Sequence, residues 1–224
     1  MLSLNTSLWA AECKTAIDFS KKCTLTLNEV HPTQFVVGMV SINLKKIKLA
    51  EKFKERTLKK YLKKKWAPSV IGPDGYYYIT DRHHLTRSIY EAKIPLKNKI
   101  IYTKVSADLR EKSFDEFYKY MKDNKFVYLK KTGQEERDIE DLPKHISYLE
   151  NDRFRSLSWI VREKGGYDKV DVLFLEFLWA DYLYRMGVRI KDEIISDEVI
   201  NISIKYVALE DASDLPGFIP ATFN

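Results

Sequence analysis

Residues 69–92 read SVIGPDGYYYITDRHHLTRSIYEA and predict two strands, a tight turn and a helix in direct succession. Ser69–Ile71 is a short apolar run, and Tyr76–Thr80 is rich in residues typical of strands. The GPDG sequence at 72–75 is a turn, because proline suits its second position and glycine accepts a positive φ. The pattern predicts a β-hairpin that leads through the DRHH sequence at 81–84 into a helix.

A strand that ends in a polar run and opens a helix predicts an anion site. The first N–H groups of a helix lack intrahelical partners, and the helix dipole adds partial positive charge. We expect Thr80 or Asp81 to cap this helix and Arg82 to bind phosphate. His83 and His84 then supply imidazoles for general acid–base catalysis, beside the Asp81 carboxylate. The structural alternative is that Asp81 caps the helix while both histidines satisfy local backbone groups.

A second cluster of charged residues surrounds the Gly165-Gly166 pair. Arg155 and Arg162 are seven residues apart, so they share one helix face, and Lys169 follows the glycines. In one interpretation these cations complete a phosphate pocket with the DRHH sequence, and Glu176 acts as a catalytic carboxylate. In the other, the arginines pair with Glu176 and Asp181 and join two helices.

The stretch from 44 to 65 is strongly basic. It contains eleven Lys or Arg and two Asp or Glu, so it carries +9, against +6 for the whole chain. Such a face favours contact with DNA or RNA phosphates, for which we name the lysines at its end: Lys59, Lys60, Lys63 and Lys64. The alternative is a solvated helix face whose lysine stems cover apolar surface.

The order of the predicted elements indicates an α+β fold. Strands are expected at 24–27, 35–40 and 100–105, and helices at 44–64, after Ser113, at 145–164 and at 167–186. Strands and helices mix in the first half, whereas helices dominate the second. We therefore expect a mixed α/β core over 1–125 and a helical C-terminal part over 126–224, packed as one compact unit.

Composition limits the class of protein. Apolar residues make up 45% of the 224 positions and charged residues 31%, which suits a folded globular chain rather than a disordered one. No apolar run approaches the ~20 residues of a membrane span, and no signal sequence is evident, so a cytoplasmic location is expected, with a secreted effector as the alternative. Cys13 and Cys23 could form one disulfide, although a chain of this size does not need one.

Four ordered motifs resemble the "putative ParB-like nuclease" family of the ParB/sulfiredoxin superfamily. The first is PTQ at 32–34 with VG at 37–38, and the second is TDRHHL at 80–85. The third is the block DRFRSLSWIVREKGGYDK at 152–169, and the fourth is FLEFLWAD at 174–181. The family resemblance covers about residues 30–185 and implies a ParB/sulfiredoxin-like fold with a helical C-terminal extension.

The resemblance also implies a ligand. In this superfamily the strand–turn–helix unit binds nucleotide phosphates, namely CTP in ParB, ATP in sulfiredoxin and ADP in an archaeal free-serine kinase. ATP, ADP or CTP is therefore the expected cofactor, with Mg²⁺ as a possible companion. The sulfiredoxin cysteine, the arginine-rich motif of ParB and a helix-turn-helix are missing here, so sulfiredoxin chemistry and chromosome partitioning are not expected.

The residues leave three functions open. They are phosphoryl transfer from a nucleotide, cleavage of phosphodiesters as a nuclease, and nucleotide-dependent interaction or regulation without catalysis. Many members of the family have an acidic residue shortly after the VG pair, whereas this chain has Met39-Val40-Ser41. That difference favours the non-catalytic alternative, and the basic stretch favours the nuclease.

Overall fold

The computed structural model describes residue 13, residues 18–191 and residues 194–221. A five-stranded mixed sheet has the order β1-β6-β4-β5-β2. Its strands are β1 (Cys23–Thr26), β2 (Val30–Pro32), β4 (Ala67–Ile71), β5 (Tyr77–Ile79) and β6 (Ile100–Asp108). β1 is antiparallel to β6, and β4 is antiparallel to β5. β4 is parallel to β6, and β2 is parallel to β5.

The hairpin predicted from the GPDG turn is present as β4 and β5. Gly75 has a φ of 78°, the left-handed conformation for which a glycine is suited. The chain leaves β5 and enters α3 (His83–Glu91) within four residues. The short connection places the DRHH sequence at the end of the sheet.

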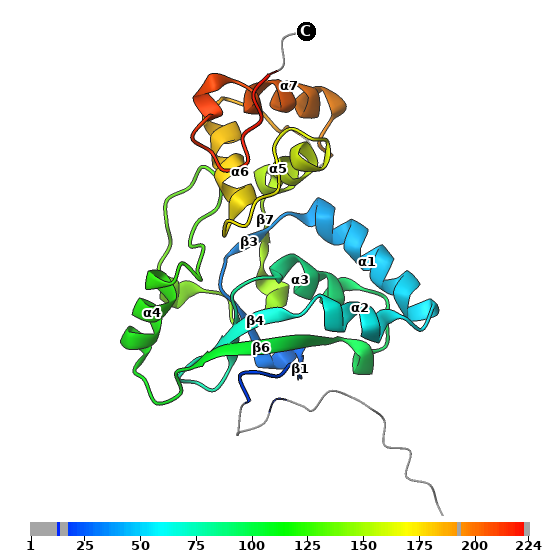
Figure 1. Ribbon diagram of the computed structural model, residues 1–224, viewed down its shortest axis with the longest axis vertical. Coiled ribbons are helices and arrows are strands. Elements are labelled where there is room, and N and C mark those ends of the chain that lie inside the picture. The colour runs from blue at the N-terminus through cyan, green and yellow to red at the C-terminus, as the bar shows by residue number, and fades with distance from the viewer. Residues whose placement is uncertain (1–12, 14–17, 192–193, 222–224) are drawn as a thin grey trace, which may run out of the picture.

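Three helices pack against the sheet, α3 together with α1 (Met39–Lys54) and α2 (Leu58–Lys64) (Figure 1). The prediction of one helix over 44–64 is wrong, because the chain bends between α1 and α2, where Arg56 has a φ of 58°. The strand expected over 35–40 is also shorter than predicted. It is reduced to β3 (Val36–Val37), which pairs in parallel with β7 (Glu150–Asn151), and α1 starts directly after Gly38.

The helix predicted after Ser113 is α4 (Phe114–Asp123). Ser113 and Glu116 form a capping box, in which each side chain binds the backbone N–H of the other residue. After α4, Tyr128 forms a single parallel bridge with Gln34.

Helices α5 (Arg153–Glu163), α6 (Leu175–Arg185) and α7 (Asp197–Val207) gather at one end of the molecule (Figure 1). The long helices predicted at 145–164 and 167–186 are both too long. Asp168 donates its backbone N–H to the Gly217 carbonyl at 2.7 Å, and the buried Tyr167 ring stacks on Trp179 at 4.4 Å. These tertiary contacts accompany an irregular path over 167–174, which contains bends and a turn, and α6 begins eight residues later than its apolar pattern suggests.

Apolar packing joins the α/β part to the helical part. One buried cluster contains Val70 and Tyr78 of the sheet, Phe117 of α4 and Phe177 of α6. A second cluster lies within α5, α6 and α7, and the largest lies between the sheet and α1–α3. The division at residue 125 into two parts of one compact unit stays a prediction.

Two further findings concern the cysteines and the length of the helices. Cys13 and Cys23 are joined by a disulfide, with their Cα atoms 5.0 Å apart, so the bond that the sequence left open is formed. Among the described residues, none of the helices combines the length and the apolar character that a membrane crossing requires.

Candidate functional site

A cavity of about 380 Å³ lies between the start of α3, the first half of α1, the α5 helix and the segment 169–177. All nine residues that the sequence singled out around the DRHH and Gly-Gly sequences contribute to its lining. They are Thr80, Asp81, Arg82, His83, His84, Arg155, Arg162, Lys169 and Glu176. The fold thus brings together two clusters that are some seventy residues apart in the chain.

The start of α3 differs from the expected cap. The N-cap is Arg82, with a φ of 68° in the left-handed region, and neither Thr80 nor Asp81 caps the helix. The Asp81 carboxylate instead accepts the backbone N–H of Arg82 at 2.5 Å and lies 3.4 Å from its Nε. Within the described part of the chain no side chain forms an N-cap hydrogen bond to this helix, and its first residues line the cavity together with Asp81.

The His83 imidazole is buried and engaged with the backbone. Its Nε2 accepts the N–H of Thr33 at 3.0 Å. Burial lowers the pKa of His83 to about 4, so the ring is neutral at pH 7. His83 thereby fastens the segment after β2 to the start of α3, and its catalytic role stays a prediction.

His84, the next residue, makes an equivalent bond. Its Nε2 accepts the N–H of Gly38 at 2.9 Å. Burial, followed by the charges of Arg155 and Lys45, holds the pKa of His84 well below 6.5. In a neutral ring whose Nε2 accepts, the proton lies on Nδ1, so His84 can donate a hydrogen bond but cannot accept a proton at Nε2 without releasing Gly38.

Arg155 is the most deeply buried cation of the cavity, with 7% of its surface exposed. Its Nη2 lies 3.2 Å from Glu176 Oε2, and its guanidinium lies over the Phe177 ring at 5.1 Å. Nε and Nη1 are buried and have no hydrogen-bond partner among the residues that the structure describes. Two buried donors without acceptors are costly and call for a ligand with acceptor oxygens.

Arg162 and Glu176 complete an ion-pair network beside Arg155. Arg162 binds Glu176 through Nη1 and Glu163 through Nη2, the latter at 2.7 Å. Burial alone would raise the pKa of Glu176, but Arg155 and Arg162 outweigh it and hold the pKa below its usual value. Glu176 is therefore an ionised partner of two arginines, which is the network predicted as the alternative to a pocket.

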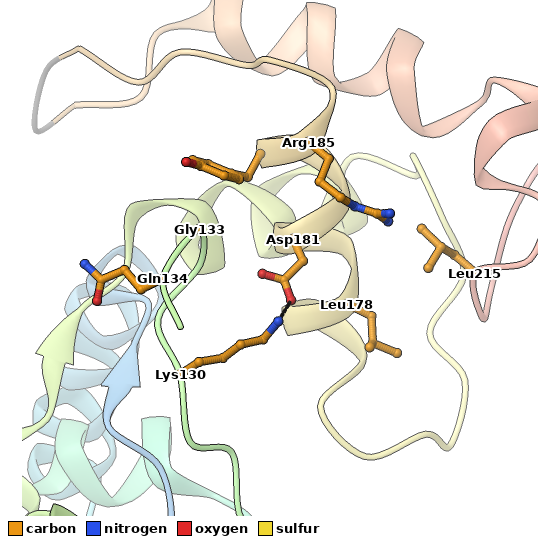
Figure 2. Close-up of a pocket in the computed structure, with 8 residues that line it drawn as sticks. Lys130, Gly133, Gln134, Leu178, Asp181, Arg185 and Leu215 are labelled. Atoms are coloured by element: carbon orange, nitrogen blue, oxygen red, sulfur yellow. Dashed lines mark ion pairs between the residues drawn. The ribbon is translucent and has the colours of Figure 1, made fainter. Parts of the chain in front are cut away.

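The prediction that Asp181 also pairs with the arginines is wrong. Asp181 pairs with Lys130 at 2.7 Å, beside a different cavity (Figure 2). Glu176 and Asp181 both belong to α6, but they lie on different faces of this helix and line different cavities. The two interpretations of the arginines are thus compatible, because the same guanidinium groups bind Glu176 and line the cavity.

Lys45 is a cavity residue that sequence reasoning missed. It lies on α1, lines the cavity and has its Nζ 5.5 Å from the centre of the Trp159 ring. Burial, with a contribution from Arg155, lowers the pKa of Lys45 to about 8. Ser41 also lines the cavity and lies four residues before Lys45, so the two share one face of α1. That spacing is the signal that distinguishes Lys45 from the other lysines of the basic stretch.

The lysines named for nucleic-acid contact lie elsewhere. Lys59, Lys60, Lys63 and Lys64 are exposed on α2, and none of them lines the cavity. Their role in binding DNA or RNA stays a prediction.

Metal ligands do not gather in this cavity. Over the described ranges, no three or more His, Cys, Asp or Glu side chains lie close enough together to hold a metal ion. Of the cavity carboxylates, Glu176 is occupied by two arginines. The residues present therefore do not form an all-protein site for Mg²⁺, an ion that proteins often hold largely through substrate phosphates.

The family model described as "putative ParB-like nuclease" matches residues 23–185. The chain belongs to this family. The match includes all nine of the predicted cavity residues, which lie between Thr80 and Glu176. It confirms the family resemblance that the four motifs indicated.

The fold is similar to that of a solved structure. The crystal structure of protein Atu1540 from Agrobacterium tumefaciens has a TM-score of 0.75 and 29% sequence identity, and the similarity covers 90% of this chain and 98% of that one. Comparison with curated proteins gives no match. The α+β fold of a ParB-like protein with a helical C-terminal part is thus confirmed.

Proposed function

We propose that the chain binds the phosphate groups of a nucleotide or nucleic acid in the cavity between α3 and α5, and acts there on a phosphoester or phosphoanhydride bond. The observation that carries the proposal is the buried Arg155 guanidinium. Arg155 lines the same cavity as the start of α3, and its Nε and Nη1 lack acceptors among the described residues. Phosphate oxygens match the planar fork of arginine in geometry and charge.

The charge of the cavity supports an anionic ligand. Five cations line it, Lys45, Arg82, Arg155, Arg162 and Lys169, against three carboxylates, Asp81, Asp171 and Glu176, so the lining sums to +2. The α3 N-terminus adds about half a positive charge. The excess suits a ligand that carries two or more negative charges.

The side chains that can take part in proton transfer are few. Glu176 is a weak base, because two arginines stabilise its ionised form. Lys45, with a pKa of about 8, releases its proton more readily than an ordinary lysine and lies among the phosphate-binding cations. In this proposal Lys45 and the Nδ1–H of His84 contact the reacting phosphate, and Arg155 and Arg162 offset the charge that develops on its oxygens.

The non-catalytic alternative has one observation in its favour. Ser41 lines the cavity in the region where many family members have an acidic residue, and its hydroxyl donates to the Gly38 carbonyl at 3.2 Å. A cavity that lacks this carboxylate binds phosphate without a strong base next to it. The two functions differ in one measurable respect, which is product formation.

A ligand panel tests the proposal. Thermal unfolding is measured with pyrophosphate, ATP, ADP, CTP, GTP and a short single-stranded DNA, each with and without Mg²⁺. A ligand at a hundredfold excess over its Kd stabilises by about 2.7 kcal/mol. Binding that Arg155→Met weakens and the control Arg185→Met leaves intact supports the proposal, since Arg185 is exposed on α6 outside this cavity. If no phosphate compound stabilises the wild type, the proposal fails.

Product analysis of the same mixtures separates the two functions. Released phosphate, diphosphate or shortened DNA indicates catalysis, and intact ligand after long incubation indicates a binding module.

A further inference from the structure

A second, larger cavity adjoins the first. Its volume is about 950 Å³, and the segment Val172–Phe174 lines both cavities. Its other walls come from the segment after α4, from 136–138 and from Leu178 of α6. One short stretch of chain therefore separates a cationic cavity from a second one of different character.

The second cavity combines apolar side chains with an aromatic wall. Val172 is 43% exposed, Leu173 46% and Leu178 36%, although all three are large apolar residues. The Tyr128 ring forms part of the wall and stacks on Phe177 at 4.0 Å, which holds its orientation. Exposed apolar groups gathered around an aromatic ring mark a binding surface for a flat, apolar group.

Charged residues of the second cavity favour an anion at its rim. Lys122 and Lys125 line it, and neither forms an ion pair with any residue in the described ranges. Arg137 also lines it but is held by Glu150 at 2.7 Å. Glu136 and Asp138 are the carboxylates of the lining, so the cations exceed them by one.

We propose that the second cavity binds the nucleoside that adjoins the phosphate held in the first cavity, and that the ligand is a single strand of nucleic acid. This inference rests on the proposed function. The base packs against Tyr128, Phe174 and the exposed apolar side chains, and the next phosphate along the strand binds Lys122 and Lys125. A cationic track with aromatic surface between phosphate contacts is the arrangement that single-stranded nucleic acids require.

The position of Phe174 between the two cavities explains how one ligand can occupy both of them. Phe174 lines both cavities and is the N-cap of α6, with a φ of 58°. The turn at Phe174 directs the start of α6 toward the phosphate cavity, while its side chain lies against Tyr128, with ring centres 5.4 Å apart. A phosphate and its attached nucleoside would contact the two sides of this turn.

A third cavity, of about 440 Å³, continues past Leu178 and serves as a control region (Figure 2). Lys130 and Asp181 form an ion pair within it, so its lysine is already neutralised. Gln134 lines this third cavity, is exposed and does not line the second one. Substitution of Gln134 therefore tests whether any change on this side of α6 affects binding.

The test compares two ligands on the full chain. Binding of pyrophosphate, which needs the first cavity alone, is measured by calorimetry, and binding of a labelled single-stranded oligothymidylate by fluorescence anisotropy. The variants are Lys122→Ala with Lys125→Ala, and the same pair with Leu178→Asp. The matched controls are Lys93→Ala with Lys97→Ala, Leu209→Asp and Gln134→Ala. Leu209 is 42% exposed, a fraction similar to the 36% of Leu178.

We expect the triple variant to bind the oligonucleotide about ten- to a hundredfold more weakly, the range for removal of a stacked base and its neighbouring phosphate interactions, and to bind pyrophosphate normally. The lysine pair alone, which disturbs no apolar packing, should give a smaller reduction in the same direction. If the oligonucleotide binds all variants as it binds the wild type, or if pyrophosphate binding falls equally, the second cavity has no such role. If neither ligand binds the wild type, the proposed function itself is wrong.

Discussion

Arg155 binds Glu176 through one of its three guanidinium nitrogens, Nη2, at 3.2 Å, and keeps Nε and Nη1 unpaired within the described part of the chain. Glu176 fixes the position of the guanidinium, and Arg162 shares the same carboxylate. Arg162 also pairs with Glu163, so the two carboxylates balance the two arginines in charge, and Arg155 still has two nitrogens available to hydrogen-bond an acceptor. The ion pair thus acts as a support for an anion site.

Arg155→Met should weaken binding of a phosphate ligand by about 1.5–3 kcal/mol, which is the change expected when a hydrogen bond to a charged group is removed. Stability should change little, because methionine fills similar apolar space and Glu176 keeps Arg162. Calorimetric titration and urea unfolding measure the two quantities. A variant that unfolds easily yet binds phosphate normally would show that Arg155 has a structural role alone.

His83 should make the stability of the protein depend on pH. Its folded-state pKa is lowered from 6.5 to about 4, so the folded state binds fewer protons than the unfolded state between these values. The stabilisation is fully present above pH 6.5 and is lost as the pH falls toward 4. At ~1.4 kcal/mol per pKa unit the decrease is about 3 kcal/mol.

Urea unfolding from pH 7 to pH 4 measures this dependence for the wild type and for His83→Gln. The variant should be less stable at pH 7, because Thr33 loses its acceptor, and should show a shallower decline with acid, with His84 contributing the remainder in the same direction. Parallel curves for the two proteins would contradict the assignment.

Lys45 should make phosphate binding depend on pH in the alkaline range. Its pKa of about 8 means that it carries its charge below pH 8 and loses it above. The charged groups that act on it are Arg155, Arg162, Glu163 and Glu176. Affinity for ATP should therefore fall by roughly tenfold above pH 8, the equivalent of one ionic hydrogen bond. Lys45→Met should bind more weakly at pH 7 and show no such decline.

The ligand-free protein should show the opposite trend. Because the folded pKa of Lys45 lies below the unfolded value of 10.5, the unfolded state binds more protons between the two values. Stability should rise as the pH increases from 8 toward 10.5, in the wild type and not in Lys45→Met.

The lysines of α2 should contribute to nucleic-acid affinity without sequence preference. Changing Lys59, Lys60, Lys63 and Lys64 to Glu should weaken binding of all DNA or RNA sequences alike. The log–log slope of affinity against salt should decrease by about 0.7–0.9 for each phosphate that the variant no longer neutralises. Equal salt slopes in wild type and variant would assign these lysines to a solvated surface.

Several features of the fold follow from the sequence because they are local. The GPDG turn, the alternation of β-rich residues around it and the polar run before α3 depend on neighbours a few positions away, and all are present. The same holds for the Ser113–Glu116 capping box. The sequence also named nine residues of the cavity, from the strand–polar–helix pattern around DRHH and from the arginines near the Gly-Gly pair.

Other features were decided by the tertiary structure. The segment 167–174 is predicted to start a helix, but it is irregular, with Asp168 bound to the Gly217 carbonyl and Tyr167 stacked on Trp179. The use of both histidines as acceptors for Thr33 and Gly38 depends on a close approach in which a Cβ at Gly38 would lie 2.9 Å from the Ser156 backbone nitrogen.

Lys45 shows the physical reason for this difference most clearly. Its residue type and its basic neighbours predict an exposed lysine, and the periodicity places it in a helix, although α1 starts and ends earlier than the predicted helix over 44–64. Its low pKa arises from burial and from Arg155, a residue more than a hundred positions away. Sequence by itself determined the local elements, such as the 69–80 hairpin and the start of the helix after it, and which charged groups the chain contains. The folded structure alone decided which of those charges share one desolvated cavity, because desolvation and electrostatic coupling depend on distance in space and not along the chain.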